Sequence, residues 1–210
     1  VASTGVSRQA LYESVQDDYL EVYKGVFNDS IDDLYYHSLL LTLPSESYLA
    51  GRVNQVDPQV IYEARSALKH RLADVLKPYL IERFNILSES GNPSYNVAQM
   101  GRRSMLSLCL SYLSILGRED PHFKSVACEH ATGLFERSFG VNMTDTVTAL
   151  SALHYIDPTE AESALARFHE RFKGAPLVIN KWLDIQAATP NDKALETVKA
   201  LIEHPSFSIE

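Results

Sequence analysis

Cysteines and long apolar runs are scarce in this chain of 210 residues. The only cysteines are Cys109 and Cys128, which are too few for a disulfide framework. Both lie in apolar patterns of helical spacing, which predicts two buried free thiols. No stretch of about 18 apolar residues occurs, so the sequence offers no candidate for a transmembrane helix.

The N-terminal residues do not look like the N-terminus of a full-length protein. The segment that begins at Val1 has no initiator methionine and no signal-peptide pattern. We therefore expect the chain to be an excised piece of a longer protein. Missing targeting signals then say little about the parent, and the compartment stays open, with the cytoplasm preferred.

Positive charge is also in short supply, since 19 Lys and Arg face 27 Asp and Glu and give a net charge of −8. Non-specific binding to DNA or RNA needs a basic surface, so we expect no nucleic-acid partner. The densest basic segments are Lys69-His70-Arg71 and Arg102-Arg103, which we interpret as solvated helix faces. Hydrophobic residues make up 45% of the chain, enough to exclude disorder and to form a core.

Between glycines and prolines at segment edges, apolar residues recur at helical spacing almost throughout. No block of strands with hairpin turns appears. The predicted helices cover residues 9–26, 30–42, 45–53, 58–88, 95–116, 121–137, 143–153, 158–172, 178–188 and 191–203. About ten helices with short links predict an all-α fold, an irregular HEAT/armadillo-like solenoid of antiparallel helix pairs that forms one domain over 1–210.

Three details of this pattern can be tested. Asp57-Pro58 should open the helix at 58–88, and Pro78 should kink or divide it. Residues 105–116 fit a strand by alternation, but they are apolar nearly all round a helix, so we interpret them as a covered central helix. The apolar stripes expected to face neighbours are Leu11, Val15, Tyr19, Val22 and Tyr23 in the first helix, and Ile31, Leu34, Tyr35 and Leu39 in the second.

Polar residues at segment starts predict helix caps. Ser45, Asn142 and Asp157 are expected to cap the helices that follow them. The glycosylation-type triplets at 28–30 and 142–144 are interpreted as caps at helix starts. Asp32-Asp33 is expected to serve the first turn of a helix, where negative charge meets the helix dipole.

No metal site can be assembled from the sequence. A zinc hydrolase needs two histidines one helical turn apart, but in His169-Glu170-Arg171-Phe172-Lys173 the fifth position is a lysine, so His169 is expected at the surface or at a boundary. Cys128-Glu129-His130 with His122 lacks the spacing of a structural zinc site. We predict no metal-binding residue.

Catalytic and cofactor-binding patterns are missing as well. There is no Gly-x-Ser-x-Gly elbow and no glycine-rich phosphate loop. Cys109 lies among leucines, where a thiol is inert, and the neighbours Asp17-Asp18 point in different directions on a helix. We predict no catalytic and no cofactor-binding residue. Trp182, the one tryptophan, is expected to anchor one helix layer against another.

The last third carries a more specific pattern. The ordered features are Asn142-Met143-Thr144-Asp145, Ala149-Leu150-Ser151-Ala152-Leu153, Phe168, Phe172, Pro176-Leu177-Val178, Lys181-Trp182, Gln186-Ala187, Leu195-Glu196-Thr197-Val198, Leu201, His204 and Phe207, preceded by Leu43-Pro44-Ser45-Glu46 and Val56-Asp57-Pro58-Gln59. This set resembles the C-terminal helical domain of zinc aminopeptidases of the aminopeptidase N (alanyl aminopeptidase) type. The resemblance spans roughly residues 35–207.

The resemblance implies a parent whose catalytic domain holds zinc through a His-Glu-x-x-His motif and a distant Glu, and removes N-terminal amino acids from peptides. The helical domain of such enzymes covers the active site and limits access to a peptide chamber. This sequence lacks the catalytic motif, so no zinc ligand or catalytic residue is carried over. Asn180 also stands where an Asp is more usual in the family.

The leading hypothesis is therefore a fragment that is inactive alone, with the parent's catalytic and N-terminal domains and its peptide substrates as partners, and with no membrane partner. A truncated domain would also expose hydrophobic surface that favours self-association. The alternative is a free-standing HEAT-like scaffold for protein–protein interaction. An all-α enzyme with an unrecognised pocket ranks third, because no catalytic constellation is present.

Overall fold

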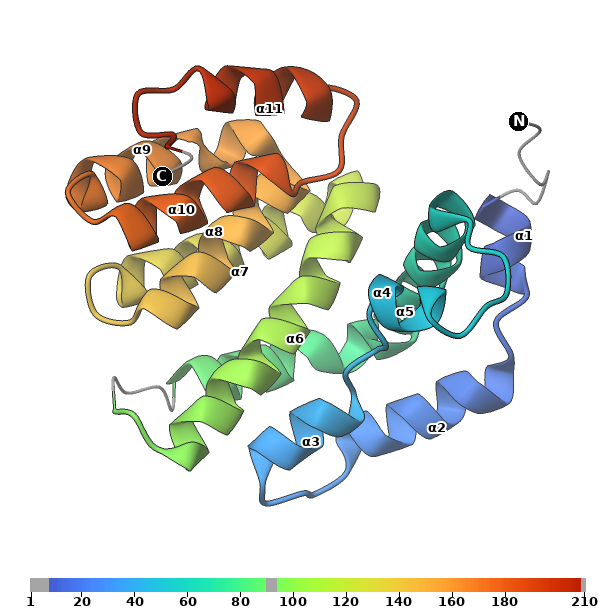
Figure 1. The fold of residues 1–210 in the computed structure, drawn as a ribbon. Coiled ribbons are helices and arrows are strands. Elements are labelled where there is room, and N and C mark those ends of the chain that lie inside the picture. Colours follow the sequence, from blue (N-terminus) through green and yellow to red (C-terminus); the bar gives the residue numbers. More distant parts are fainter. Residues whose placement is uncertain (1–7, 90–93, 209–210) are drawn as a thin grey trace. The chain divides into compact units, whose positions relative to one another are not determined.

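The computed structural model describes residues 8–89 and 94–208, and this part of the chain contains eleven helices and no strand (Figure 1). The helices are α1 (Arg8–Glu13), α2 (Asp17–Asn28), α3 (Leu34–Leu40), α4 (Glu46–Ala50), α5 (Pro58–Glu89), α6 (Val97–Glu119), α7 (Pro121–Ser138), α8 (Met143–Ile156), α9 (Pro158–Phe172), α10 (Pro176–Ala187) and α11 (Ala194–Ile202). The prediction of an all-α chain is confirmed. None of the described helices is long and apolar enough to cross a lipid bilayer.

The chain divides into two compact units, residues 1–116 and 117–210. The boundary falls inside α6, four residues before α7 begins. That residues 1–210 form a single domain stays a prediction.

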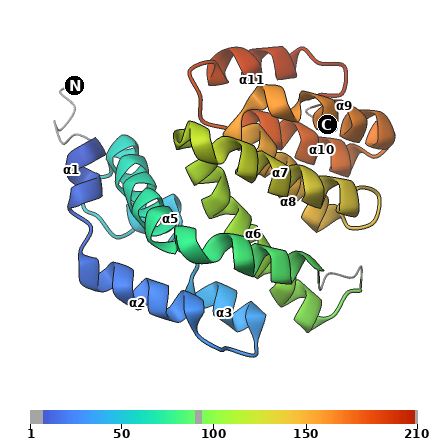
Figure 2. The same ribbon diagram turned by 180° about the vertical axis from the view of Figure 1, so that it is seen from behind.

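The first unit is organised around α5, which contacts α1, α2 and α4. Its helix continues through Pro78, and Figure 2 shows the ribbon of α5 changing direction part-way along. A bend is the expected effect of a proline that removes one backbone hydrogen bond. The fully buried side chains of this unit include Phe27, Leu41, Leu72, Leu76, Leu80, Phe84, Met105, Leu106, Leu110 and Leu113.

The helical interpretation of residues 105–116 is confirmed, because they lie inside α6. Met105, Leu106, Cys109 and Leu110 have no exposed surface, as expected for a helix that is apolar nearly all round. Tyr112 is buried too, and its hydroxyl lies 2.8 Å from that of Tyr23, which donates to the Leu41 carbonyl at 2.6 Å. Burial raises the pKa of both tyrosines.

The single helix predicted for 9–26 is wrong, since α1 ends at Glu13 and α2 begins at Asp17. The Ser14 hydroxyl donates to the Leu11 carbonyl at 2.7 Å, a local bond that competes with helix continuation. Gln16 is extended. The stripe shifts with the break: Tyr23 is buried as predicted, but Tyr19 and Val22 are exposed, and Leu20 and Phe27 are buried instead.

The predicted basic faces are also wrong, because His70, Arg102 and Arg103 are buried. The Arg102 guanidinium donates to the Gln99 side chain at 2.9 Å and to the Leu87 carbonyl, near the end of α5, at 3.1 Å. A buried charge is tolerated when its donors find such acceptors. Arg102 therefore joins α6 to α5 inside the first unit, and Arg103 donates to the Ser94 carbonyl just before α6 at 3.3 Å.

The second unit stacks α7 to α11 in sequence order. Helix α8 contacts α7, α9 and α10, and α10 also contacts α9 and α11. The links are short, which favours antiparallel neighbours. The first link turns at Gly140, whose φ of +78° suits a residue without Cβ. The buried side chains at the centre of this unit include Phe123, Ala127, Leu134, Phe135, Leu150, Leu153, Leu165 and Phe168.

Most predicted caps are confirmed. The side chains of Ser45, Asp57, Asn142 and Asp157 each accept a backbone N–H from the first turn of the following helix. Asp33 caps α3 by accepting from the N–H groups of residues 35 and 36 at 2.9 and 3.0 Å. The triplet at 28–30 was misplaced, because residue 28 ends α2 rather than starting a helix.

Candidate functional site

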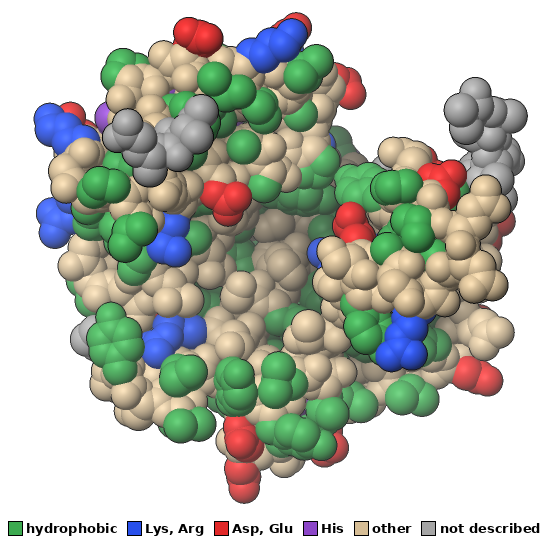
Figure 3. All heavy atoms as spheres, in the orientation of Figure 1, with side chains coloured by type: hydrophobic (Ala, Val, Ile, Leu, Met, Phe, Trp, Pro, Cys, Tyr) green, Lys and Arg blue, Asp and Glu red, His purple; other side chains and the backbone are tan. Residues whose placement is uncertain are grey.

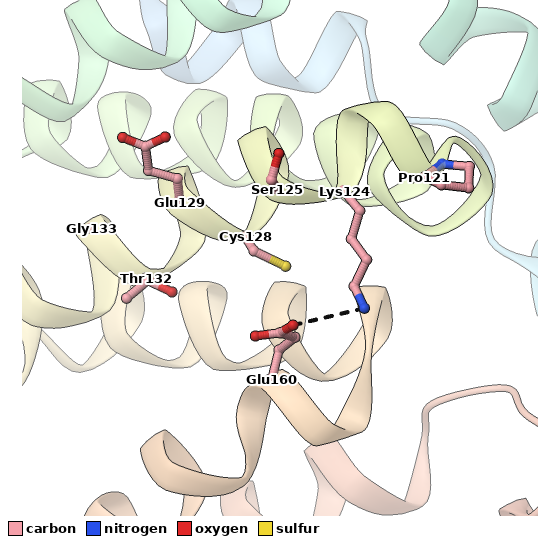
Figure 4. Close-up of a pocket in the computed structure, with 8 residues that line it drawn as sticks. All are labelled: Pro121, Lys124, Ser125, Cys128, Glu129, Thr132, Gly133 and Glu160. Atoms are coloured by element: carbon pink, nitrogen blue, oxygen red, sulfur yellow. Dashed lines mark ion pairs between the residues drawn. The ribbon is translucent and has the colours of Figure 1, made fainter.

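A groove of about 690 Å³ lies between α7 and α9 in the second unit. It is lined by Pro121, Lys124, Ser125, Cys128, Glu129, Thr132, Gly133 and Glu160. In Figure 4, the side chains of Lys124 and Cys128 on α7 point toward Glu160 on α9. Cys128 and Glu129, part of the triplet that the sequence analysis rejected as a zinc site, line this groove.

The charge of Lys124 is already compensated. Its Nζ atom lies 2.5 Å from Asp157 Oδ2 and 3.8 Å from Glu160 Oε1. The hydrogen bond from Lys124 holds the pKa of the Asp157 carboxyl below its ordinary value, and that same bond raises the pKa of Lys124. The pair links α7 to the start of α9 and leaves little free positive charge in the groove.

The thiol at the groove is not activated. Burial, followed by the charge of Glu160, raises the pKa of Cys128, so the thiol stays protonated at neutral pH, whereas a nucleophile must be a thiolate. Cys109 is fully buried, and burial raises its pKa to about 12. Both cysteines are free, as predicted, although Cys128 is only half-buried.

We expect Asp157 to make stability depend on pH. Because its pKa is lowered in the folded state, its contribution is complete above the ordinary carboxyl pKa and is lost as the pH falls through the lowered value. The variant Asp157→Asn keeps a capping oxygen but no charge, so its free energy of unfolding should fall less steeply below about pH 4. Urea unfolding at several pH values measures both slopes.

Asp157→Ala is the matched comparison, because it also loses the cap on the Thr159 N–H. It should cost about 1 to 2 kcal/mol at neutral pH. Identical pH slopes for the wild type and Asp157→Asn would contradict the role of the ion pair.

A smaller cavity of about 280 Å³ lies between α8 and α10 and includes Tyr155, Lys181 and Asp184. Next to it, the buried ring of His154 lies 2.7 Å from the Thr189 hydroxyl. Burial lowers the pKa of His154, so the ring is neutral at physiological pH. The Thr189 hydroxyl donates to the Ile185 carbonyl at 3.0 Å, so it accepts from His154 Nδ1 and that ring is not placed to take its proton.

The histidine of the near-zinc motif belongs to an aromatic cluster. His169 and His204 lie 4.8 and 5.0 Å from the ring of Trp182, measured between centroids, and 5.3 Å from each other. His169 Nε2 also contacts the Ser206 hydroxyl at 2.9 Å. The boundary position predicted for His169 and the anchoring role predicted for Trp182 are both confirmed.

The other possible ligands do not converge. His130 Nδ1 contacts the Val126 carbonyl of its own helix at 2.8 Å. Among residues 8–89 and 94–208, no group of three or more His, Cys, Asp or Glu side chains could hold a metal ion.

One surface feature escaped the sequence pattern. Helix α3 buries His37 and Ser38, which are 0% and 5% exposed, and turns Tyr36 and Leu39 outward at 53% and 52%. Tyr35 and Leu39 were expected on a buried stripe, so that part of the prediction is wrong. No sequence signal could have found this, because a helical stripe does not show which side of a short helix is covered.

Comparison with known proteins decides the family. A family model described as "Domain of unknown function (DUF3458_C) ARM repeats" matches residues 3–210. The chain belongs to this DUF3458_C family. ARM repeats are stacked helix pairs, so the predicted HEAT/armadillo-like fold class is confirmed.

Relatives of this DUF3458_C chain carry the name Aminopeptidase N. The protein of Caulobacter vibrioides is 32% identical over 192 residues, which are 91% of this chain and 21% of the relative. The protein of Haemophilus influenzae is 29% identical over 200 residues, 92% of this chain and 21% of the relative. The crystal structure of Legionella pneumophila aminopeptidase A in complex with aspartic acid matches with a TM-score of 0.77 and 28% identity, over 96% of this chain and 25% of that one.

The resemblance to the aminopeptidase N type is thereby confirmed. The chain spans about one fifth of the length of the curated relatives that it matches. It corresponds to one region of much longer aminopeptidase chains.

Proposed function

We propose that the chain is the C-terminal helical domain of a zinc-dependent aminopeptidase, and that its role is steric. The parent would remove N-terminal amino acids from peptides, and this part would shape or cover the chamber through which peptides enter. The observation that supports this proposal most is that about nine-tenths of the chain matches about one fifth of the length of proteins named Aminopeptidase N.

The described residues of this chain do not fit a zinc site, because no suitable group of ligands converges among them. The zinc of the proposed parent would be held by residues outside this chain. This chain would contribute a packed wall of capped helices, in which Arg102 joins α6 to α5 and Lys124 pairs with Asp157 between α7 and α9.

We expect the isolated chain to show no hydrolysis of alanyl-arylamides, with or without added zinc. The physical reasons are that no metal-ligand group converges among the described side chains and that burial raises the pKa of both thiols, Cys109 and Cys128. Two quantities are measured: the release of the arylamine, and the amount of zinc bound per chain, which mass spectrometry gives. Zinc-dependent turnover by the purified chain would refute the proposal that it lacks a catalytic site.

A chimera tests the positive part of the proposal. In it, this chain replaces the matching segment of the Caulobacter vibrioides aminopeptidase N, and the control lacks that segment altogether. If the chain serves as the equivalent domain, the chimera should hydrolyse alanyl-arylamides within about tenfold of the natural relative. A chimera no better than the deletion control would refute the proposed function.

The second candidate is a free-standing interaction scaffold. The exposed apolar side of α3 favours it, because such surfaces occur at protein–protein contacts. A His-Glu-x-x-His motif in the flanking reading frame would decide against this candidate.

A further inference from the structure

Helix α3 turns four apolar or aromatic side chains outward while it buries two polar ones. The outward side chains Tyr35, Tyr36, Leu39 and Leu40 are between 41% and 53% exposed, whereas His37 and Ser38 are buried. A helix at the edge of a soluble unit normally turns its apolar stripe inward. We call these four outward residues the α3 outer face.

The inner contacts of α3 prevent it from rotating to hide this face. His37 Nε2 donates to the Val26 carbonyl of α2 at 2.7 Å, which ties α3 to the preceding helix. Gly101 of α6 lies so close that a Cβ there would be 2.4 Å from the Tyr35 nitrogen. The backbone of α3 is therefore held against α6, and the outer face is presented in a fixed orientation.

The chain segment that carries the α3 outer face is acidic. Asp29, Asp32 and Asp33 are exposed in the loop that joins α2 to α3, and residues 25–51 contain no lysine and no arginine. Figure 3 shows hydrophobic side chains gathered over α2 and α3, with acidic side chains at their edge. A partner with a basic rim is thus favoured by charge complementarity.

The same charges disfavour a second copy as the occupant. In a two-fold symmetric dimer the same patch meets itself, so an acidic rim would face a surface whose residues 25–51 offer no lysine or arginine to pair with it. Like charges brought together across an interface weaken it. The four-fifths of the relatives' length that lie outside the matched region supply another source of partner surface.

We infer that the α3 outer face is a docking surface for another part of the parent polypeptide, an apolar patch rimmed by lysine or arginine. This inference rests on the proposed function, because it takes the parent to be a longer aminopeptidase chain. Two tyrosines and two leucines form a typical interface centre, since tyrosine is enriched and aspartate depleted there, with the aspartates at the rim.

The experiment compares the 210-residue chain with the Caulobacter vibrioides chimera described above. Hydroxyl-radical labelling of Tyr35 and Tyr36 should fall several-fold in the chimera, because docking shields both rings. The double variant Leu39→Glu and Leu40→Glu should lower the thermal midpoint of the chimera by about 5 °C or more. The same double variant should leave the midpoint of the isolated chain within about 2 °C, since both side chains are half-exposed.

Two further variants sharpen the result. Leu177→Glu on α10 is the matched control, because Leu177 is 81% exposed and lies in the second unit, and it should leave the chimera unchanged. The pair Asp29→Asn and Asp32→Asn should reduce the salt dependence of the chimera's midpoint, since exposed charge pairs are screened by salt.

Equal hydroxyl-radical labelling of Tyr35 and Tyr36 in the isolated chain and in the chimera would overturn the inference, as would equal losses of thermal midpoint in both. If the chimera is active at the same time, the proposed function still stands. An inactive chimera would overturn the proposed function, and with it the partner named here. A dimer of the isolated chain that the Leu39→Glu and Leu40→Glu variant abolishes in sedimentation would identify a second copy as the occupant and overturn the inference.

Discussion

The substitution Gly101→Ala is expected to lower the free energy of unfolding by about 3 kcal/mol or more, at the upper end for overpacked sites. The new Cβ would lie 2.4 Å from the Tyr35 nitrogen and 2.9 Å from the Leu34 carbonyl carbon. Both are backbone atoms at the start of α3, which cannot yield as a flexible side chain can. Helix α3 would have to move away from α6, which would also loosen the contact of His37 with the Val26 carbonyl.

Gly25→Ala on α2 is the matched control. Gly25 also lies inside a helix, but a Cβ there meets nothing within 4 Å. It should therefore stabilise the chain by about 0.5 to 1 kcal/mol, because alanine loses less backbone freedom on folding. Guanidinium unfolding measures both variants, and similar effects at the two glycines would show that α3 and α6 are not in close contact.

The local parts of this fold could be predicted from the sequence. A cap such as Ser45 or Asn142 acts on N–H groups two or three residues away, so its partner is visible in the sequence. The helical character of residues 105–116 follows from their own composition. For the same reason, the starts of α5, α7, α8 and α9 were placed to within about two residues.

Contacts between distant segments could not be predicted in this way. Nothing near Gly101 in the sequence indicates that α3 passes within van der Waals contact of it. The guanidinium of Arg102 is buried because the Leu87 carbonyl, fifteen residues away, accepts its hydrogen bond, and a basic pair alone gives no sign of that. The break between α1 and α2 depends on one serine hydroxyl, a weak local signal.

For the candidate site, the sequence shows which catalytic and metal-binding motifs it lacks more readily than it shows which surface binds a partner. The spacing of His169 and Lys173 excludes a paired zinc ligand, and the structure places His169 against Trp182 instead. The outward apolar side of α3 was not predicted, because Tyr35 and Leu39 fit a helical stripe equally well whether that stripe is buried or exposed. Only the positions of His37 and Ser38 in the folded chain decide which side is covered.

The second large effect is expected for Trp182→Ala, which should cost about 3 to 5 kcal/mol. Trp182 is 8% exposed, and its Nε1 donates to the Leu165 carbonyl of α9 at 3.1 Å. Its ring lies beside His169 and His204, so it joins α9, α10 and the segment after α11. Removing it leaves a cavity where three segments meet. Since the chain has one tryptophan, unfolding must be followed by circular dichroism.

Trp182→Phe separates packing from hydrogen bonding. Phenylalanine retains an aromatic ring near the two histidines but has no donor for the Leu165 carbonyl, so it should cost much less, about 1 kcal/mol for the lost hydrogen bond plus a smaller packing loss. Helix α11 has no fully buried residue of its own, so its position depends on this cluster and on α10. Trypsin should therefore cut at Lys193 and Lys199 earlier in Trp182→Ala than in Trp182→Phe. Equal cleavage rates in the two variants would mean that α11 is held by contacts other than those of the tryptophan ring.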